Sequence, residues 1–527
     1  MSAPLAYLRL VKAGFVLARE GVFSLLPRED APLGARLVLW CADLIAPREV
    51  DRKSKGDRLN AALNRLGPSY IKLGQFLATR PDIVGADLAD GLGKLRDEVP
   101  PFADETARQI IQSNLNREVD LLYRSFSAPV AAASIAQVHK AVTSDGDPYS
   151  DKKVAVKVLR PDVRQRFHKD LESFYAAARL LQRLDPSTRR LRPVAVVDTL
   201  ARSVTMEMDL RIEAAALSEM ADIAADDPHF AVPAVDWDRT GRDVLTIGWI
   251  DGLKLTELDA LKAAGHDIPA LATNLIQIFL RHALNHGFFH ADMHQGNLFV
   301  DQQSRIVAID FGIMGRIGPK ERKFLAEILY GFIKRDYLRV AEVHFEAGYV
   351  PATQSVADFA QALRAVGEPI HGQSAQDISM ARLLGLLFEI TELFDMQTRT
   401  ELLMLQKTMV VVEGVSRSLD SNFDMWTASE PVLRDWLTQN LGPGAKIEQA
   451  AGGLSSLGRL LNELPALAER AAHASQALDE MAANGLRLDE ASLRRLAEYQ
   501  ARETRASRVA LAVMAVSVAA VALAYVF

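Results

Sequence analysis

Two acidic residues and an amide near the middle of the chain have the spacing of a phosphoryl-transfer site. Asp292 and Asn297 are five positions apart, and Asp310 follows after a short strand–turn–strand pattern. Phosphoryl transfer needs a carboxylate that orients the attacking hydroxyl or water. It also needs an amide and a second carboxylate that hold magnesium against the phosphates. We therefore predict that Asp292 is catalytic and that Asn297 and Asp310 are Mg²⁺ ligands.

The order of these residues matches two motifs of protein kinases. Those enzymes place the catalytic acid and the amide in H-R-D-x-x-x-x-N and the metal-binding acid in D-F-G. Here the first motif begins at His290, and the second is unaltered at Asp310. A lone D-F-G would carry little weight in a chain of 527 residues. Two motifs in this order, separated by a hairpin pattern, are a strong signal for a kinase-like active site.

A lysine upstream has the pattern of a phosphate-binding residue. Lys157 ends a Val-Ala-Val-Lys run, which is typical of the strand-borne lysine that contacts the α- and β-phosphates of ATP. A carboxylate from a following helix must hold such a lysine in place. Glu207, Asp209 and Glu213 are the candidates, and their spacing alone does not choose among them.

The segment before Lys157 departs from the glycine-rich loop of kinases. That loop is G-x-G-x-x-G because its backbone amides must approach the phosphates closely. The residues at this place are Ala131, Ala132, Ala133 and Ser134. Alanine takes positive φ less readily than glycine. We therefore expect a stiffer ATP-binding loop whose amides point in different directions.

Strands come first along the chain and helices follow, which predicts an α+β, kinase-like fold of two lobes with the nucleotide between them. Periodicity predicts helices over 30–125, strands at 129–141, 153–159 and 244–252, and helices over 161–225, 270–287 and from 319 onward. The helix that begins by Pro319 leaves no room for an activation loop after the D-F-G motif. A platform for peptide substrates is therefore not expected.

The last residues predict a membrane anchor. Residues 509–527 carry no charge, and Arg502, Arg505 and Arg508 precede them. At about 1.5 Å per residue, a helix here would span roughly the hydrocarbon core of a bilayer. The arginines predict that the large domain stays in the cytoplasm. Small residues at 512, 515 and 519 could let two such helices pair as a homodimer.

The first residues predict an amphipathic helix. Apolar positions recur at three- and four-residue steps over residues 4–26, together with Arg9, Lys12, Arg19 and Glu20. Packing against the rest of the protein and contact with an anionic membrane surface are equal alternatives for this helix. The charges leave no uncharged apolar core for a secretory signal.

Composition narrows the class of protein. Charged residues make up 24% of the chain, the net charge is −6, and no run of Lys or Arg marks a basic tail. We therefore expect no nucleic-acid partner. The single cysteine, Cys41, excludes an internal disulfide and a cysteine-built zinc site.

Taken together, the motifs resemble the UbiB family of atypical kinases, also called the aarF-domain-containing or ADCK family, over roughly residues 25–430. The distinctive motif of that family, Lys-x-Gly-Gln, stands here from Lys72 to Gln75. The other matching features are the alanine-rich loop at residues 131–134, the strand lysine Lys157, the Glu-x-Asp motif at Glu207 and Asp209, the lysine-pairing glutamate Glu213, and the two acid motifs.

The resemblance implies binding of ATP and Mg²⁺, an ATPase or small-molecule kinase-like activity, and a role in ubiquinone biosynthesis at a membrane. It also implies that the Lys-x-Gly-Gln segment covers the site where a protein substrate would dock. Lys72 would then lie near Glu207 and Asp209, and these three residues join Asp292 as catalytic candidates. Bacterial members usually end in two membrane segments, whereas this sequence predicts one.

The expected domain order follows from these motifs. It is a helical extension with the Lys-x-Gly-Gln motif at 1–125, an N-lobe at 126–255, a C-lobe at 256–435, a helical linker at 436–506 and a transmembrane helix at 507–527.

The leading hypothesis is a membrane-anchored enzyme at a bacterial inner membrane, with its catalytic domain on the cytoplasmic side. Its expected partners are membrane lipids and either quinone-precursor lipids or enzymes of ubiquinone biosynthesis. The alternative is a nucleotide-gated scaffold or lipid-extraction protein with little turnover. Ordinary protein kinase activity is the least favoured interpretation.

Overall fold

The computed structural model describes most of the chain between residues 3 and 441. The described residues are 3–25, 40, 44–45, 55–78, 84, 86–93, 95, 99–144, 151–184, 192–371, 390, 393–396 and 400–441. The chain divides into two compact units, Met1–Lys12 with Thr438–Phe527, and Ala13–Leu437. The second unit contains every predicted site residue. The predicted transmembrane helix at 507–527 lies outside the described residues, as does nearly all of the predicted linker at 436–506.

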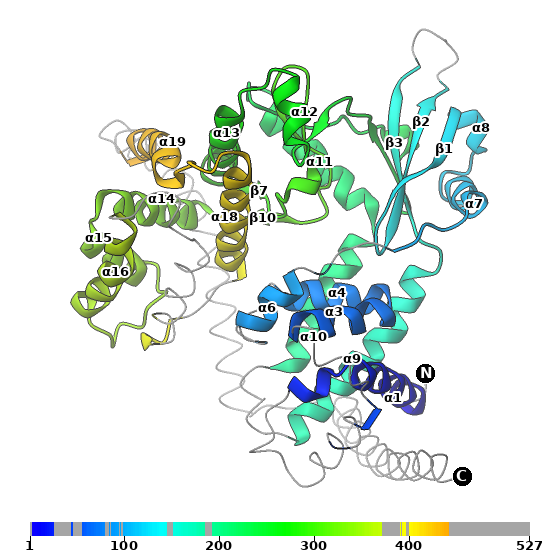
Figure 1. The fold of residues 1–527 in the computed structure, drawn as a ribbon, viewed down its shortest axis with the longest axis horizontal. Helices are drawn as coiled ribbons and strands as arrows, with labels where there is room; N and C mark the ends of the chain where they lie inside the picture. Colours follow the sequence, from blue (N-terminus) through cyan, green and yellow to red (C-terminus); the bar gives the residue numbers. More distant parts are fainter. Residues whose placement is uncertain are drawn as a thin grey trace, which may run out of the picture. The chain divides into compact units, whose positions relative to one another are not determined.

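Four antiparallel strands form the sheet of the N-lobe, and helices pack against it (Figure 1). The strands are β1 (Tyr123–Ala132), β2 (Ala136–Thr143), β3 (Lys153–Leu159) and β5 (Val244–Gly248), in the order β1-β2-β3-β5. Alternate side chains of β3, namely Val154, Val156 and Val158, are buried in one core with Ala107 and Ile111 of α7 (Asp104–Leu115). The short helix α8 (Val119–Leu122) leads into β1.

The segment predicted as one strand at 129–141 is two strands. A tight turn at residues 133–135 separates β1 from β2, and Ala132 pairs with Gln137 across it. Alternation alone does not locate such a turn, because both strands continue the same apolar and small-residue pattern. The strand predicted at 153–159 is confirmed as β3.

Three helices occupy the region predicted as helical at 161–225. They are α9 (Val163–Leu184), α10 (Pro193–Glu207) and α11 (Leu210–Ala224). Asp209 caps α11 by accepting a hydrogen bond from the backbone N–H of Arg211 at 3.2 Å. Such a cap satisfies an amide that the first helical turn leaves without a partner. Because α10 ends at Glu207 and α11 begins at Leu210, Glu207 and Glu213 lie on different helices.

A small helical extension precedes the sheet. Its described helices are α3 (Lys55–Leu66), α4 (Pro68–Ala78) and α6 (Ala86–Gly93). Helices α3 and α6 meet at Gly56 and Gly91, where a Cβ on Gly56 would lie 2.6 Å from the Cα of Gly91. Only glycine fits at this contact. Helix α4 packs on α9 through an edge-to-face contact of Tyr70 with Phe174, whose ring centroids are 5.0 Å apart.

The C-lobe carries the predicted acid motifs on short strands that follow a long buried helix. That helix is α13 (Ile268–Arg281), and it continues into a π-helix, η5 (His282–His286). After Gly287, whose φ is 65°, the chain enters β7 (Phe288–His290), which pairs antiparallel with β10 (Met314–Arg316). A second small sheet consists of β4 (Phe230–Ala231), β9 (Ile306–Ala308), β8 (Leu298–Val300) and β6 (Leu253–Lys254), in that order.

The remaining described helical elements, apart from α1, belong to the extension and the two lobes. They are η1 (Val22–Leu25), η4 (Trp237–Arg239), α12 (Leu258–Ala263), η6 (Gln295–Asn297), α14 (Pro319–Lys334), α15 (Tyr337–Glu346), α16 (Val356–His371), α18 (Thr400–Leu419) and α19 (Met425–Leu441). Helix α18 packs along α13. The helix predicted from 319 onward is confirmed as α14.

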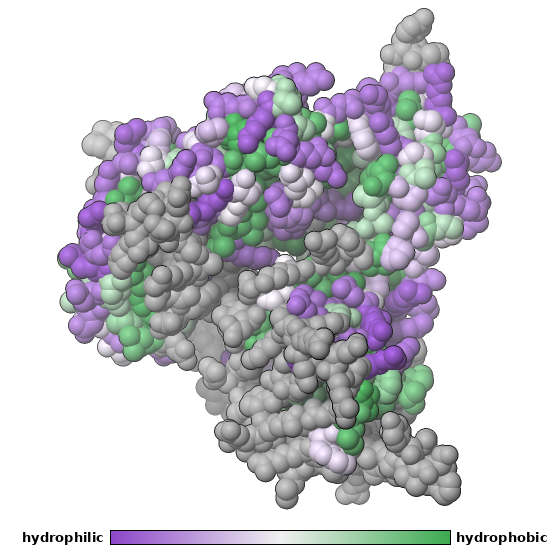
Figure 2. All heavy atoms as spheres, viewed as in Figure 1, coloured by the Kyte–Doolittle hydropathy of each residue, from purple (hydrophilic) through white to green (hydrophobic). Residues whose placement is uncertain are grey.

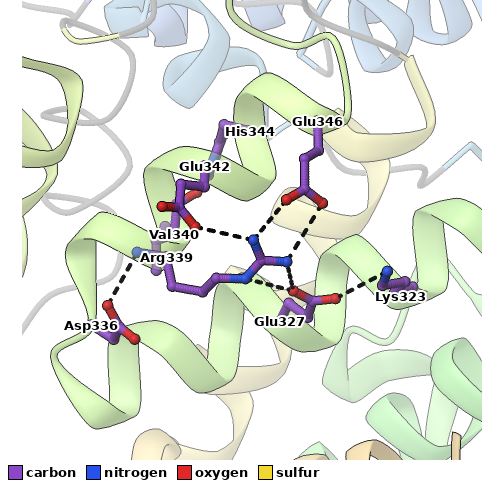
Figure 3. Close-up of polar contacts among 8 residues, drawn as sticks. All are labelled: Lys323, Glu327, Asp336, Arg339, Val340, Glu342, His344 and Glu346. Atoms are coloured by element: carbon purple, nitrogen blue, oxygen red, sulfur yellow. Dashed lines mark hydrogen bonds and ion pairs between the residues drawn. The ribbon is translucent and has the colours of Figure 1, made fainter. Parts of the chain in front are cut away.

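A cluster of charges joins α14 to α15 (Figure 3). The guanidinium of Arg339 donates to Glu327 of α14 at 3.0 Å, and to Glu342 and Glu346 of its own helix at 3.2 and 2.7 Å. These carboxylates raise the pKa of Arg339 above its usual value, although burial opposes the shift. The cluster holds α14 against α15, the two helices that follow the acid motifs along the chain.

The predicted N-terminal amphipathic helix is α1 (Ala3–Arg19). Its buried positions are the small residues Ala6, Ala13 and Ala18. The large apolar side chains of Leu5, Leu8, Val11 and Phe15 are exposed, and hydrophobic residues are visible over this helix in Figure 2. In the part of the chain that the structure describes, no helix has both the length and the apolar character required to cross a bilayer.

Candidate functional site

Hydrogen bonds between side chains and backbone order the loop after β7, which carries the first acid motif. The N–H of Asp292 donates to Nδ1 of His290 at 3.0 Å, and Nδ2 of Asn297 donates to the carbonyl oxygen of Asp292 at 3.2 Å. His294 accepts the N–H of Gly296 at 3.1 Å and so caps η6, which carries Asn297. These bonds fix the backbone of Asp292 and the side-chain amide of Asn297 on one short loop.

Asp310 lies beside this loop and faces the N-lobe lysine. Its Oδ2 is 3.5 Å from Nζ of Lys157, and its Oδ1 accepts the N–H of Gly312 at 3.0 Å. Burial alone would raise the pKa of Asp310, but the Lys157 ammonium and the Gly312 amide lower it well below its usual value. The side chain is still 45% exposed. Asp310 is therefore a charged carboxylate that ligands can reach.

Glu213 is the carboxylate that pairs with Lys157, which answers the question that spacing left open. Nζ of Lys157 donates to both carboxylate oxygens of Glu213, at 2.7 and 2.9 Å. Burial would lower the pKa of Lys157, but Asp310 and Glu213 together raise it above its usual value. The ammonium therefore remains charged between a buried carboxylate and a partly exposed one.

The predicted Lys-x-Gly-Gln lysine enters the same region from the helical extension. Nζ of Lys72 on α4 is 2.7 Å from Oε2 of Glu207, the last residue of α10, and both side chains are largely buried. The charge of Lys72 also contributes to lowering the pKa of Asp310. Asp209 is arranged differently, because its carboxylate is bound to the guanidinium of Arg211 at 2.6 and 2.9 Å.

The four residues predicted to cover the phosphates do not form one loop. Ala131 and Ala132 are the last residues of β1, whereas Ala133 and Ser134 belong to the turn. We call residues 133–135 the alanine-rich turn. The N–H of Ala133 donates to the carbonyl oxygen of Ala136 at 2.8 Å, which closes the turn.

Sequence reasoning missed side chains that reach this region from distant segments. Oγ1 of the buried Thr408 on α18 lies 3.2 Å from the carbonyl oxygen of Ala291 and 2.8 Å from that of Met404. Nε1 of Trp436 donates to the carbonyl oxygen of Leu284 in η5 at 2.9 Å. The sequence feature that could have pointed to Thr408 is its hydroxyl, which stands among the apolar residues of α18.

The donor set fits a magnesium ion only when phosphate oxygens complete it. Magnesium prefers oxygen ligands and commonly takes one or two from carboxylates and the rest from phosphates and water. Asp310 and Asn297 supply a carboxylate and an amide from adjacent loops. Among the described residues, no group of three or more His, Cys, Asp or Glu side chains has a metal-binding arrangement. A magnesium ion held by Asp310 and Asn297 would take its remaining ligands from phosphates and water.

Comparisons with known proteins agree with this geometry. The ABC1 atypical kinase-like domain matches residues 94–344, and the UbiB helical domain matches residues 363–424. The two-lobed arrangement and its paired acids are thus those of an atypical kinase-like protein.

Similar curated proteins define the family. The "Probable protein kinase UbiB" of Marinobacter nauticus is 37% identical over 467 residues, which cover 87% of this chain and 84% of that protein. The protein of the same name from Azotobacter vinelandii is 38% identical over 419 residues, covering 79% and 77%. The chain belongs to the UbiB family, and the resemblance inferred from the motifs is confirmed.

A solved structure is also similar. It is described as the complex of Rv3197 with erythromycin from Mycobacterium tuberculosis, with 25% identity and a TM-score of 0.47, covering 71% of this chain and 95% of that chain.

Proposed function

We propose that this protein is an ATP-dependent, Mg²⁺-requiring enzyme that supports ubiquinone biosynthesis by hydrolysing ATP or phosphorylating a small molecule. The observation that carries the proposal is the position of Lys157, which is bonded to Glu213 and faces Asp310 across the two lobes. An ammonium held in this way is suited to contact nucleotide phosphates.

Each residue of the site has a role in this proposal. Lys157, held by Glu213, binds the phosphates and exchanges its contact with Asp310 for phosphate oxygens. Asn297 and Asp310 hold Mg²⁺, which offsets the negative charge of the phosphates when it is bound. Asp292 orients the attacking hydroxyl or water. The side chains of His290 and Asn297 hold the backbone of Asp292 before substrate arrives.

The acceptor is proposed to be water or a small molecule, not a protein. The chain returns from Asp310 directly into β10, which pairs with β7, and α14 begins at Pro319. Substrate peptides of protein kinases lie against an activation segment at this place, and such a segment does not fit between these elements. The largely buried ion pair of Lys72 from the extension with Glu207 from α10 occupies further space beside the nucleotide site.

The proposal places the enzyme at the cytoplasmic side of a bacterial inner membrane. The uncharged residues 509–527 supply an anchor, with pairing of two such helices as a route to a homodimer. Helix α1 presents exposed apolar side chains, and its residues include Arg9 and Lys12 but no acid, which favours contact with anionic lipids. Quinone-precursor lipids or enzymes of ubiquinone synthesis are the proposed partners there.

The test is ATP turnover by the purified full-length protein with Mg²⁺, with and without anionic vesicles and phenolic quinone precursors. We expect turnover that Asp310→Asn abolishes and that Asp259→Asn, the same change at an exposed position of α12, leaves unchanged. Nucleotide binding without turnover under all of these conditions would reject the enzyme and favour the nucleotide-gated scaffold. Phosphorylation of an added peptide by the unaltered chain would reject the proposed acceptor class.

A further inference from the structure

The side chain of Arg160 joins the alanine-rich turn to a separate segment of the chain. Its Nε donates to the carbonyl oxygen of Ala133, its Nη1 to that of Pro100 and its Nη2 to that of Val99, each at 2.9 Å. A guanidinium is planar and presents its donors in a fixed fork. Three bonds of this length therefore fix the turn and residues 99–100 relative to one another.

The backbone of Arg160 also contributes to this junction. Its N–H donates to the carbonyl oxygen of Ile135 at 2.8 Å. One residue therefore binds both ends of the turn, Ala133 through the side chain and Ile135 through the main chain. All of these acceptors are backbone carbonyls, so the contacts determine the path of the chain and do not depend on which side chains the turn carries.

A second side chain strengthens the same junction from β2. Oε1 of the buried Gln137 accepts the N–H of Phe102 at 2.9 Å, and its Nε2 lies 3.3 Å from the carbonyl oxygen of Phe102. The guanidinium of Arg160 also lies 5.8 Å from the centroid of the Phe102 ring. Residues 99–102 are thus attached at two points to the hairpin that contains the turn.

The position of Arg160 links this junction to the nucleotide site. Arg160 follows β3 directly and is three residues beyond Lys157 on the same chain segment. The ammonium that would contact the phosphates and the guanidinium that holds the turn therefore lie on one short chain segment, β3 and the residue after it. Residues 99–102 follow the helical extension, which carries Lys72, so the junction also connects the turn to the chain that leaves the extension.

We propose that Arg160 is a positioning residue that holds the alanine-rich turn in place and thereby slows the release of bound nucleotide. A glycine-rich loop closes over phosphates because it is mobile, whereas this turn is tied to two other segments and keeps one position. The proposal rests on the proposed function for its effect on nucleotide, but not for the junction itself. The hydrogen bonds from Arg160 are themselves observed in the structure.

The first measurement is hydrogen–deuterium exchange of the full-length protein without nucleotide. We expect Arg160→Gln to increase exchange in both the peptide that covers 99–102 and the peptide that covers 131–136, because each segment would lose its hydrogen bonds to the guanidinium and keep only its remaining contacts. The matched control is Arg124→Gln, which removes an exposed ion pair with Asp151 from the same hairpin. Unchanged exchange in either segment would overturn the proposed junction, even if the protein bound no nucleotide.

The second measurement is the dissociation rate of a fluorescent ATP analogue with Mg²⁺, followed by stopped flow. We expect Arg160→Gln to increase this rate about tenfold, which corresponds to the loss of roughly one charge-assisted hydrogen bond, with kcat at saturating ATP nearly unchanged. Arg160→Lys, which keeps the charge and the aliphatic stem, can reach only one of the three carbonyls and should also release nucleotide faster. It serves as the test variant if the glutamine variant does not fold.

Three results separate this proposal from its alternatives. A dissociation rate like that of the unaltered chain in both variants would overturn the role in nucleotide release. Full restoration by lysine would show that charge, and not the three-carbonyl fork, is what matters, and would also overturn it. Absence of any nucleotide binding by the unaltered chain would instead reject the proposed function, while the exchange measurement would still decide on the junction.

Discussion

The ammonium of Lys157 and the carboxylate of Glu213 form a two-pronged ion pair between β3 of the sheet and α11 behind it, with N–O distances of 2.7 and 2.9 Å. Glu213 is buried, so its position is determined by packing and by this pair. The pair therefore sets where the ammonium stands with respect to Asp310.

Replacing Glu213 with glutamine should lower ATP turnover by about ten- to a hundredfold, because an amide would no longer hold the ammonium of Lys157 against the phosphates. Steady-state kinetics at saturating Mg²⁺ measure this change. The matched control is Glu219→Gln on the same helix, where the carboxylate is exposed and pairs with Arg316. Equal turnover in the two variants would contradict the role of Glu213.

Acid should destabilise the protein in a window that His282 helps to define. Burial lowers the pKa of His282 to about 4, whereas an unfolded histidine titrates near 6.5. Between these values the unfolded state binds the proton and the folded state does not, so the free energy of unfolding falls as the pH drops from about 6.5 to 4. The contribution of this one residue is at most about 3 kcal/mol.

His282→Gln should therefore reduce the slope of unfolding free energy against pH by nearly one proton in that window. Urea unfolding at a series of pH values measures the slope. His286, four residues later in η5 and exposed, provides the control His286→Gln. A slope that both variants leave unchanged would show that His282 does not remain neutral in the folded protein.

Thr408 should support catalysis from outside the catalytic loop. Thr408→Val keeps the shape of the side chain but removes the hydroxyl that lies 3.2 Å from the carbonyl oxygen of Ala291. We expect a several-fold loss of kcat with little change in KM for ATP, and recovery with Thr408→Ser. Thr205→Val, which removes an exposed hydroxyl bonded within its own helix, is the control. A loss that serine does not repair would mean that the methyl group, and not the hydroxyl, is required.

The alanine-rich turn should influence which nucleotide is preferred. Ala133→Gly would allow backbone conformations that alanine avoids, so the amides of the turn could approach the phosphates differently. We expect a change in the ratio of affinities for ATP and ADP, measured by calorimetry with Mg²⁺. Ala128→Gly, at an exposed position of β1, the strand that leads into the turn, should keep the ratio of the unaltered chain. The same ratio in all three proteins would be evidence against the prediction.

Removal of residues 507–527 should release the protein from membranes. The uncharged run at the end of the sequence is the expected anchor, and fractionation of cells followed by immunoblotting measures the release. If the shortened chain stays with the membrane, the additional change Phe15→Glu in α1 distinguishes surface binding by that helix from other modes of attachment. Retention of the doubly altered chain would contradict both membrane contacts.

The local motifs could be predicted from the sequence because each one is contiguous. The strand that carries Lys157 has a clear alternation, and the loop of Asp292 has a fixed spacing of acid and amide, so the residue pattern alone locates both. The family assignment rests on the same short motifs and agrees with the relatives.

Contacts between distant segments could not be predicted in this way. Spacing did not identify Glu213, because the helical stretch is interrupted at Met208 and the direction of α11 depends on packing. Arg160 binds backbone carbonyls some sixty residues away in the sequence, and backbone acceptors leave no pattern in the side chains. Thr408 reaches Ala291 across more than a hundred residues for the same reason.

The pairing of β10 with β7 has a consequence for control of the enzyme. Many kinases are switched on when a phosphate is attached to the segment after their metal-binding acid, which then refolds. In this chain that segment is already hydrogen-bonded into a strand within a few residues of Asp310. A phosphate attached there could not refold the segment without breaking the pairing of β10 with β7, so we expect this chain to lack that form of control.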